Sequence, residues 1–164
     1  MTVPAIIHVL EKLLELHNGL LELSRKKTEA VKSGSIDTLM TLIAQERKQI
    51  RKVEKAETER IKLVTEWFTA NDLAEEEHTI TMLLNRMETG QLKTKLLDIT
   101  TRLTEVITLL KQQEGLNHAL IQQSMQFVQY SLDLINPTIQ SITYGSASDK
   151  QNESATQSLF DSKA

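Results

Sequence analysis

The longest regular pattern in the chain begins at Leu92, where seam positions recur at alternating steps of four and three for about forty residues. At 1.5 Å per residue this pattern predicts a helix roughly 60 Å long. Pro137 follows its end and is expected to end or bend the helix. The seam positions are Leu92, Leu96, Ile99, Leu103, Val106, Leu110, Gln113, Asn117, Leu120, Ser124, Phe127, Ser131 and Leu134.

Two more long helices are predicted before it. The first runs from about Val3 to Lys32, and its apolar positions occupy an arc of roughly 200° at 100° per residue. Because a surface helix usually shows a stripe of about 100°, this helix is expected to be covered from more than one side. Gly34 predicts a left-handed cap and Ser35 the N-cap of a second helix, from Ile36 to about Phe68.

The remaining segments complete an all-α prediction. A short helix is expected from about Leu73 to Met87, with a break at Glu88-Thr89-Gly90. Beyond Gly145 the composition turns to Ser, Gln, Asn and Asp, which predicts disorder. We therefore expect an elongated antiparallel helical bundle with coiled-coil-like long helices in residues 1–145, and a disordered C-terminal tail in residues 146–164.

Composition narrows the functional classes. Aromatic residues make up 4% of the chain, which disfavours strand-rich folds, and the absence of cysteine excludes disulfides, zinc ribbons and thiol nucleophiles. The net charge is −3, with acidic and basic residues interspersed along the chain, so nucleic-acid binding is not predicted. The N-terminus matches neither a signal peptide nor a membrane span, so cytoplasmic location without stable membrane insertion is expected.

The polar residues of the last helix carry the functional prediction. Gln113, Asn117, Ser124 and Ser131 fall on the apolar seam, and a buried amide or hydroxyl without a partner costs about 1–3 kcal/mol. We therefore expect this half of the helix to be wetted until another polypeptide, an amphipathic helix, lies against it. The residues predicted to bind it are Gln113, Asn117, Leu120, Ile121, Ser124, Met125, Phe127, Val128 and Ser131.

Three sequence segments and the chain's ending carry a family resemblance. They are VKSGSIDTLMTLIAQERKQIRKVEKAETERI (31–61), GLNHALIQQSMQFVQYSLDLI (115–135), the spacing Pro137-x6-Tyr144-Gly145 and the final SLFDSKA. In this order they resemble the FlgN-type flagellar export chaperones of Gram-positive bacteria, over nearly the whole chain up to Gly145.

The resemblance implies a function. Such chaperones bind the C-terminal helical segments of the hook–filament junction proteins FlgK and FlgL, keep them soluble, and deliver them to the export gate protein FlhA. It also implies that Tyr144 docks at the gate and that no reaction is catalysed.

Two alternatives come from other functional classes. A structural coiled-coil protein would use the same wide apolar faces for self-assembly only, and a homodimer of the client-free chain stays open. A metal-dependent bundle enzyme would need paired Glu-x-x-His motifs, which are absent. No cofactor is expected.

Overall fold

A computed structural model describes the backbone of residues 2–161 and the side chains of residues 2–135. The described residues form four helices: α1 (Thr2–Lys32), α2 (Ile36–Ala70), α3 (Ile80–Arg86) and α4 (Gln91–Asp161). The residues divide into two compact units, Met1–Leu120 and Ile121–Ala164. The predicted all-α class is confirmed. Within the described residues, no helix has the length and apolar character needed to span a membrane.

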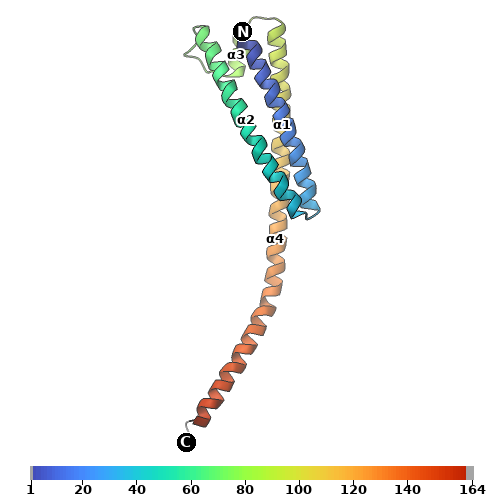
Figure 1. The fold of residues 1–164 in the computed structure, drawn as a ribbon, viewed down its shortest axis with the longest axis vertical. Helices are drawn as coiled ribbons and strands as arrows, with labels where there is room; N and C mark the ends of the chain where they lie inside the picture. Colours follow the sequence, from blue (N-terminus) through green and yellow to red (C-terminus); the bar gives the residue numbers. More distant parts are fainter. Residues whose placement is uncertain (1, 162–164) are drawn as a thin grey trace. The chain divides into compact units, whose positions relative to one another are not determined.

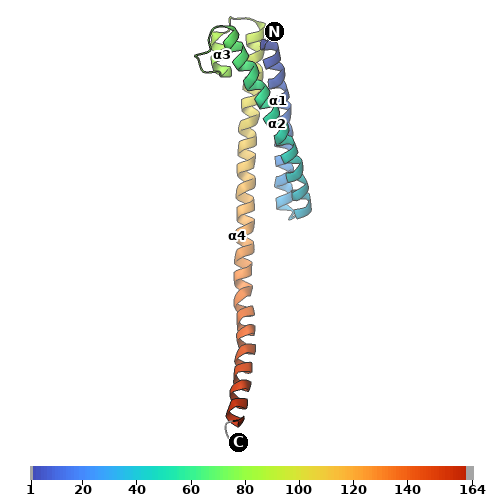
Figure 2. The ribbon, with the colours of Figure 1, turned by 60° about the vertical axis from the view of Figure 1, so that its left-hand side comes forward.

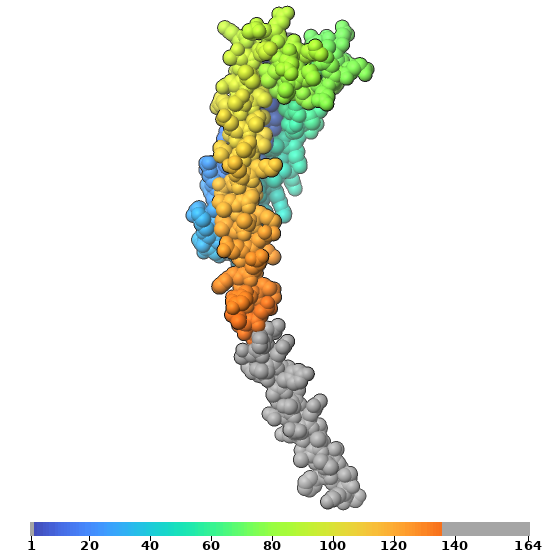
Figure 3. All heavy atoms as spheres, turned by 180° about the vertical axis from the view of Figure 1, so that it is seen from behind, coloured from blue at the N-terminus to red at the C-terminus, as the bar shows by residue number. Residues whose placement is uncertain are grey.

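The first unit is a helical bundle in which α1 and α2 form an antiparallel hairpin (Figure 1). The part of α4 up to Leu120 lies beside this hairpin and runs parallel to α1, as the second view shows (Figure 2). Seen from behind, it covers the junction of α1 and α2 (Figure 3). The expectation that the first helix is covered from more than one side is therefore confirmed.

The core of this unit draws on all four helices. Its best buried members are aliphatic side chains of α1, which pack against Phe68 of α2, Leu83 of α3 and Leu96 of α4. Burial of such side chains is the main stabilising contribution to the bundle. The fully buried cluster comprises Ile6, Ile7, Val9, Leu10, Leu13, Leu14, Ala56, Val64, Phe68, Leu83, Leu96, Ile99 and Leu103.

The turn between α1 and α2 has the predicted residues in their predicted places. Gly34 has φ of 68°, the left-handed conformation that favours glycine at the end of a helix. Ser35 stands at the N-cap of α2, but its side chain makes no hydrogen bond to the backbone there. Its hydroxyl instead donates to Oγ1 of Thr38 at 2.7 Å.

The short third helix is shorter than predicted, because only Ile80–Arg86 is helical within the expected range of 73–87. Thr79 decides where it begins, since its hydroxyl accepts a hydrogen bond from the backbone N–H of Met82 at 3.1 Å. In the preceding irregular segment, Glu76 forms a bidentate ion pair with Arg86. The ring of His78 stacks on Phe68 with centroids 4.9 Å apart, which holds this segment against the end of the bundle.

Helix α4 continues through Pro137 rather than ending there, so that part of the prediction is wrong. Proline lacks an N–H and therefore removes one backbone hydrogen bond, but its φ is compatible with a helix. The predicted domain boundary at residue 145 and the disorder of the tail in solution stay predictions.

Candidate functional site

The first half of the predicted polar seam is sealed by the chain itself. Asn117 is 2% exposed, and its Nδ2 donates to the backbone oxygen of Ser24 at 2.8 Å and to the Ser24 hydroxyl at 3.0 Å. Its Oδ1 accepts from the hydroxyl of Thr28, which in turn accepts from Nε2 of Gln113 at 2.6 Å. The expectation that these two amides await another polypeptide is therefore wrong.

An ion cluster continues this polar layer into α2. Nζ of Lys27 on α1 lies 2.6 Å from a carboxylate oxygen of Glu46 on α2 and 2.9 Å from one of Glu114 on α4. The hydroxyl of Ser24 also donates to Glu114. One lysine thus joins three helices. The side chain of Lys27 is only 9% exposed, so water screens it little.

The protonation of this cluster follows from its contacts. Burial alone would lower the pKa of Lys27, but the hydrogen bonds and charges of Glu46 and Glu114 outweigh it and raise that pKa. Burial likewise opposes ionisation of Glu114, but hydrogen bonds from Ser24 and Lys27 and the lysine charge lower its pKa. At neutral pH Lys27 is therefore protonated and Glu114 is ionised, and the ammonium group lies between the side chains of Glu46 and Glu114.

This polar layer fixes how α4 lies against α1. The amides of Gln113 and Asn117 on α4 pair with Ser24 and Thr28 on α1, so a shift of either helix by one turn would separate these partners. Within the described side chains, no buried nitrogen or oxygen lacks a hydrogen-bond partner. The layer is structural, because Gln113 and Asn117 hold α4 against α1.

The second unit has a different surface. Its residues with described side chains, 121–135, form a single helical segment of α4 with seven large apolar side chains that are each more than half exposed. Their exposed fractions lie between 54% and 71%. A contiguous apolar surface of this kind marks an interaction site in a soluble protein. The seven residues are Met125, Phe127, Val128, Tyr130, Leu132, Leu134 and Ile135.

Six of these side chains, all except Tyr130, lie on two neighbouring stripes at 100° per residue. One stripe contains Leu120, Ser124, Phe127, Ser131 and Leu134, and it is the seam seen in the sequence. The other contains Ile121, Met125, Val128, Leu132 and Ile135. Together they cover an arc of about 180°, and we call this surface the apolar face of residues 121–135.

The structure places the remaining predicted binding residues on or beside this face. Met125, Phe127 and Val128 are exposed, whereas Leu120, Ile121 and Ser131 are half-buried. Ser124 is exposed. The hydroxyl of Ser131 donates to the backbone oxygen of Phe127 at 2.9 Å. Because this bond lies within the helix, the hydroxyl adds little polarity to the face. The side chain of Tyr144 lies outside the described residues.

The sequence-based list missed part of the face. Leu132 and Ile135 belong to the second stripe and are 55% and 54% exposed. Leu132 follows Val128 by four residues and Ile135 follows Leu132 by three, and this helical spacing is the signal that would have found them. Tyr130 borders the polar side of the helix and is 63% exposed.

The face carries almost no charge. Asp133 is the one ionisable carboxyl or cation in residues 121–135, and it accepts a hydrogen bond from Gln129 at 3.0 Å. Gln122, Gln126 and Gln129 make up most of the opposite side of the helix. The apolar face of residues 121–135 therefore offers apolar contact, with the amides on the opposite side of the helix. In the part of the chain with described side chains, no group of three or more His, Asp or Glu residues is arranged to hold a metal ion.

Comparison with known proteins identifies the family. The profile described as FlgN protein matches residues 1–152. The uncharacterized protein YvyG of Bacillus subtilis (strain 168) is 32% identical over 165 residues, which covers 100% of both chains. No solved structure matches the chain. The chain therefore belongs to the FlgN family and is a flagellar chaperone.

Proposed function

We propose that this chaperone binds the C-terminal helical segments of the hook–filament junction proteins FlgK and FlgL in the cytoplasm and delivers them to the export gate protein FlhA. These segments are the clients. The proposal rests on one observation, the apolar face of residues 121–135, which is exposed and uncharged. The chaperone catalyses no reaction in this proposal and needs no cofactor.

The exposed area is large enough to bind a helix. Complete burial of a large apolar side chain contributes about 1.5–3 kcal/mol, so covering the exposed fractions of the seven side chains contributes about 10 kcal/mol. Ordering the client costs about 2–5 kcal/mol, and association costs more. The surplus supports a complex that forms in the cell and can still release its client.

Substitutions on the face test this proposal. Met125→Ser and Phe127→Ser each remove an exposed apolar side chain, and each is expected to weaken binding of a FlgK or FlgL C-terminal peptide by about tenfold. Isothermal titration calorimetry measures the affinity. Gln122→Ser and Gln126→Ser on the opposite side are the matched controls and should retain the parental affinity. Equal affinities for all four variants would contradict the proposal.

Salt provides a second test of the same face. Because residues 121–135 contain no cation and one carboxylate, Asp133 on the side opposite the face, client binding is expected to change less than about threefold between about 50 mM and 500 mM NaCl. A steep loss of affinity with salt would place the client on a charged part of the chain instead.

Gate docking is assigned to Tyr144 by family resemblance. Tyr144→Ala is expected to spare client binding, because the residue lies beyond the apolar face of residues 121–135 in sequence, and to weaken capture by FlhA. A pull-down of the chaperone–client complex on immobilised FlhA measures this effect. Undiminished capture of the variant would remove Tyr144 from the docking site.

The alternative function is self-assembly through the same face, because two copies could pair without charge repulsion. Light scattering of the client-free chain measures its mass. A dimer that dissociates when a FlgK or FlgL peptide is added fits the chaperone, since both occupy one surface. A dimer whose mass does not change when the peptides are added supports the structural alternative.

A further inference from the structure

Five cations of α2 form no ion pair, whereas most of the other cations with described side chains do. Of the 12 other Lys and Arg residues with described side chains, nine form an ion pair within 4.0 Å. Within residues 47–55 none of the five does so. We call these five residues the basic face of α2: Arg47, Lys48, Arg51, Lys52 and Lys55.

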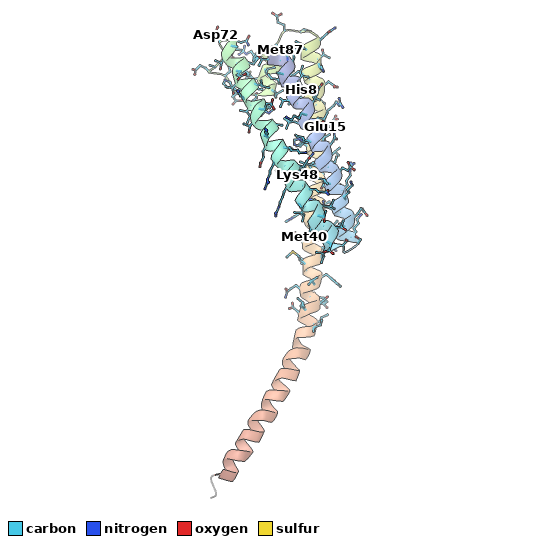
Figure 4. The ribbon with its side chains drawn as sticks, viewed as in Figure 1. His8, Glu15, Met40, Lys48, Asp72 and Met87 are labelled. Atoms are coloured by element: carbon cyan, nitrogen blue, oxygen red, sulfur yellow. The ribbon has the colours of Figure 1, made fainter. Side chains whose placement is uncertain are left out.

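The basic face points away from the core. At 100° per residue its members span an arc of about 140° and about 12 Å along the axis. Leu42 and Val64, which are buried, lie on the opposite side of α2. All five basic side chains are exposed. Lys48 and Met40 are labelled on α2 in Figure 4.

This arrangement destabilises the helix that carries it. Arg47 and Arg51, Lys48 and Lys52, and Arg51 and Lys55 are like-charge pairs at a spacing of four, which disfavour a helix. The two carboxylates in this stretch do not form ion pairs with these cations. Glu46 points inward to Lys27, and Glu54 forms no ion pair although it lies in the same stretch.

We propose that the basic face of α2 is a docking surface for an acidic protein segment that carries Asp or Glu on successive helical turns. Carboxylates spaced by three and four residues would match the rows of basic residues. Met40, which is 61% exposed, lies on the same line about two turns before Arg47 and supplies an apolar contact at one end. Arg and Met are both enriched in protein interfaces.

A protein partner fits this surface better than a lipid bilayer does. A helix that binds a membrane surface lays a broad apolar side with aromatic or leucine residues into the interface. The corresponding side of α2 is turned into the bundle, where Leu42, Val64 and Phe68 are buried. The basic face is therefore left with charge alone to attract lipid headgroups.

This docking surface is independent of client binding. The apolar face of residues 121–135 belongs to the second unit and carries no cation, whereas the basic face belongs to the first unit. The two interactions therefore differ in their response to salt.

The test uses the full-length protein and a fluorescent alanine-based helical peptide of about 20 residues with Glu at every third or fourth position. A twin peptide with Gln in place of Glu controls for helix shape. The face variant carries Arg47→Gln, Lys48→Gln, Arg51→Gln, Lys52→Gln and Lys55→Gln. A charge-matched variant carries Lys26→Gln, Lys32→Gln, Lys62→Gln, Arg102→Gln and Lys111→Gln. Fluorescence anisotropy at about 50 mM NaCl measures binding.

We expect the parent to bind the Glu peptide and not the Gln twin. The face variant should bind at least about tenfold more weakly, and the charge-matched variant within about threefold of the parent. The face variant should also unfold at the same or a higher temperature, because it loses like-charge repulsion. Equal loss in both variants, or no binding by the parent, would overturn the proposal. Binding to vesicles of phosphatidylcholine and phosphatidylglycerol, with no binding to the Glu peptide, would overturn it in favour of a membrane.

Discussion

Replacing Lys27 by Met tests whether the ion cluster holds α1, α2 and α4 together. Methionine has nearly the same length as lysine and fits a partly apolar site, so the substitution mainly removes the charge. It leaves Glu46 and Glu114 without the cation that lies 2.6 Å and 2.9 Å from their oxygens. Both carboxylates then remain partly desolvated, and no cation offsets the free-energy cost of that desolvation.

The magnitude follows from the exposure of the three side chains. Removing one partner of a fully buried ion pair costs about 3–5 kcal/mol. The side chains of Glu46 and Glu114 are 17% and 40% exposed, so water partly replaces the lost ammonium group. We therefore expect Lys27→Met to lower the free energy of unfolding by about 2–3 kcal/mol at neutral pH.

Urea unfolding followed by circular dichroism measures this change. With a slope of about 2 kcal/mol per molar urea, the midpoint should fall by about 1–1.5 M. The control is the triple variant Lys27→Met, Glu46→Gln, Glu114→Gln, which leaves no uncompensated charge and should recover to within about 1 kcal/mol of the parent. A loss below about 0.5 kcal/mol for Lys27→Met alone would refute the reasoning.

Two further predictions concern stability. The pKa of Glu114 is lowered from its ordinary value of 4.5, so its contribution is present above that pH and is lost as pH falls through the folded pKa. The pKa of Lys27 is raised from 10.5, so its contribution is complete below that pH and is lost as pH rises through the folded pKa. Urea titrations across pH should show the parent's advantage over Lys27→Met disappearing at the acidic end. An advantage that does not change with pH would contradict the assignment. Gly115→Ala should raise the free energy of unfolding by about 1 kcal/mol, because a Cβ there meets no atom within 4 Å. Gly19→Ala should gain less, because its Cβ would lie 2.7 Å from Nε2 of Gln49 and disturb the hydrogen bond from Gln49 to Leu16. Thermal denaturation compares the two glycine variants, and equal gains would contradict the packing at Gly19.

Much of the fold was predictable because local pattern and packing agree. The wide apolar arc of residues 3–32 required neighbours on more than one side, and the bundle supplies α2 and α4. Gly34 could be assigned to the turn because glycine adopts a positive φ without strain. The start of α3 was misplaced, since the cap at Thr79 and the pairing of Glu76 with Arg86 depend on contacts that periodicity does not contain.

The candidate site divides at Asn117. Sequence alone determined that polar residues occupy the seam of a long helix and that Met125, Phe127 and Val128 stand beside it, because helical spacing follows from residue identity and position. Which of these residues already have partners depends on contacts between helices that are distant in sequence. Ser24 and Thr28 face Asn117 across more than 85 residues of sequence, and a hydrogen bond between distant segments leaves no periodic mark in either. For that reason the seam could be read from the chain, whereas its division into a sealed polar layer and an exposed apolar face could not.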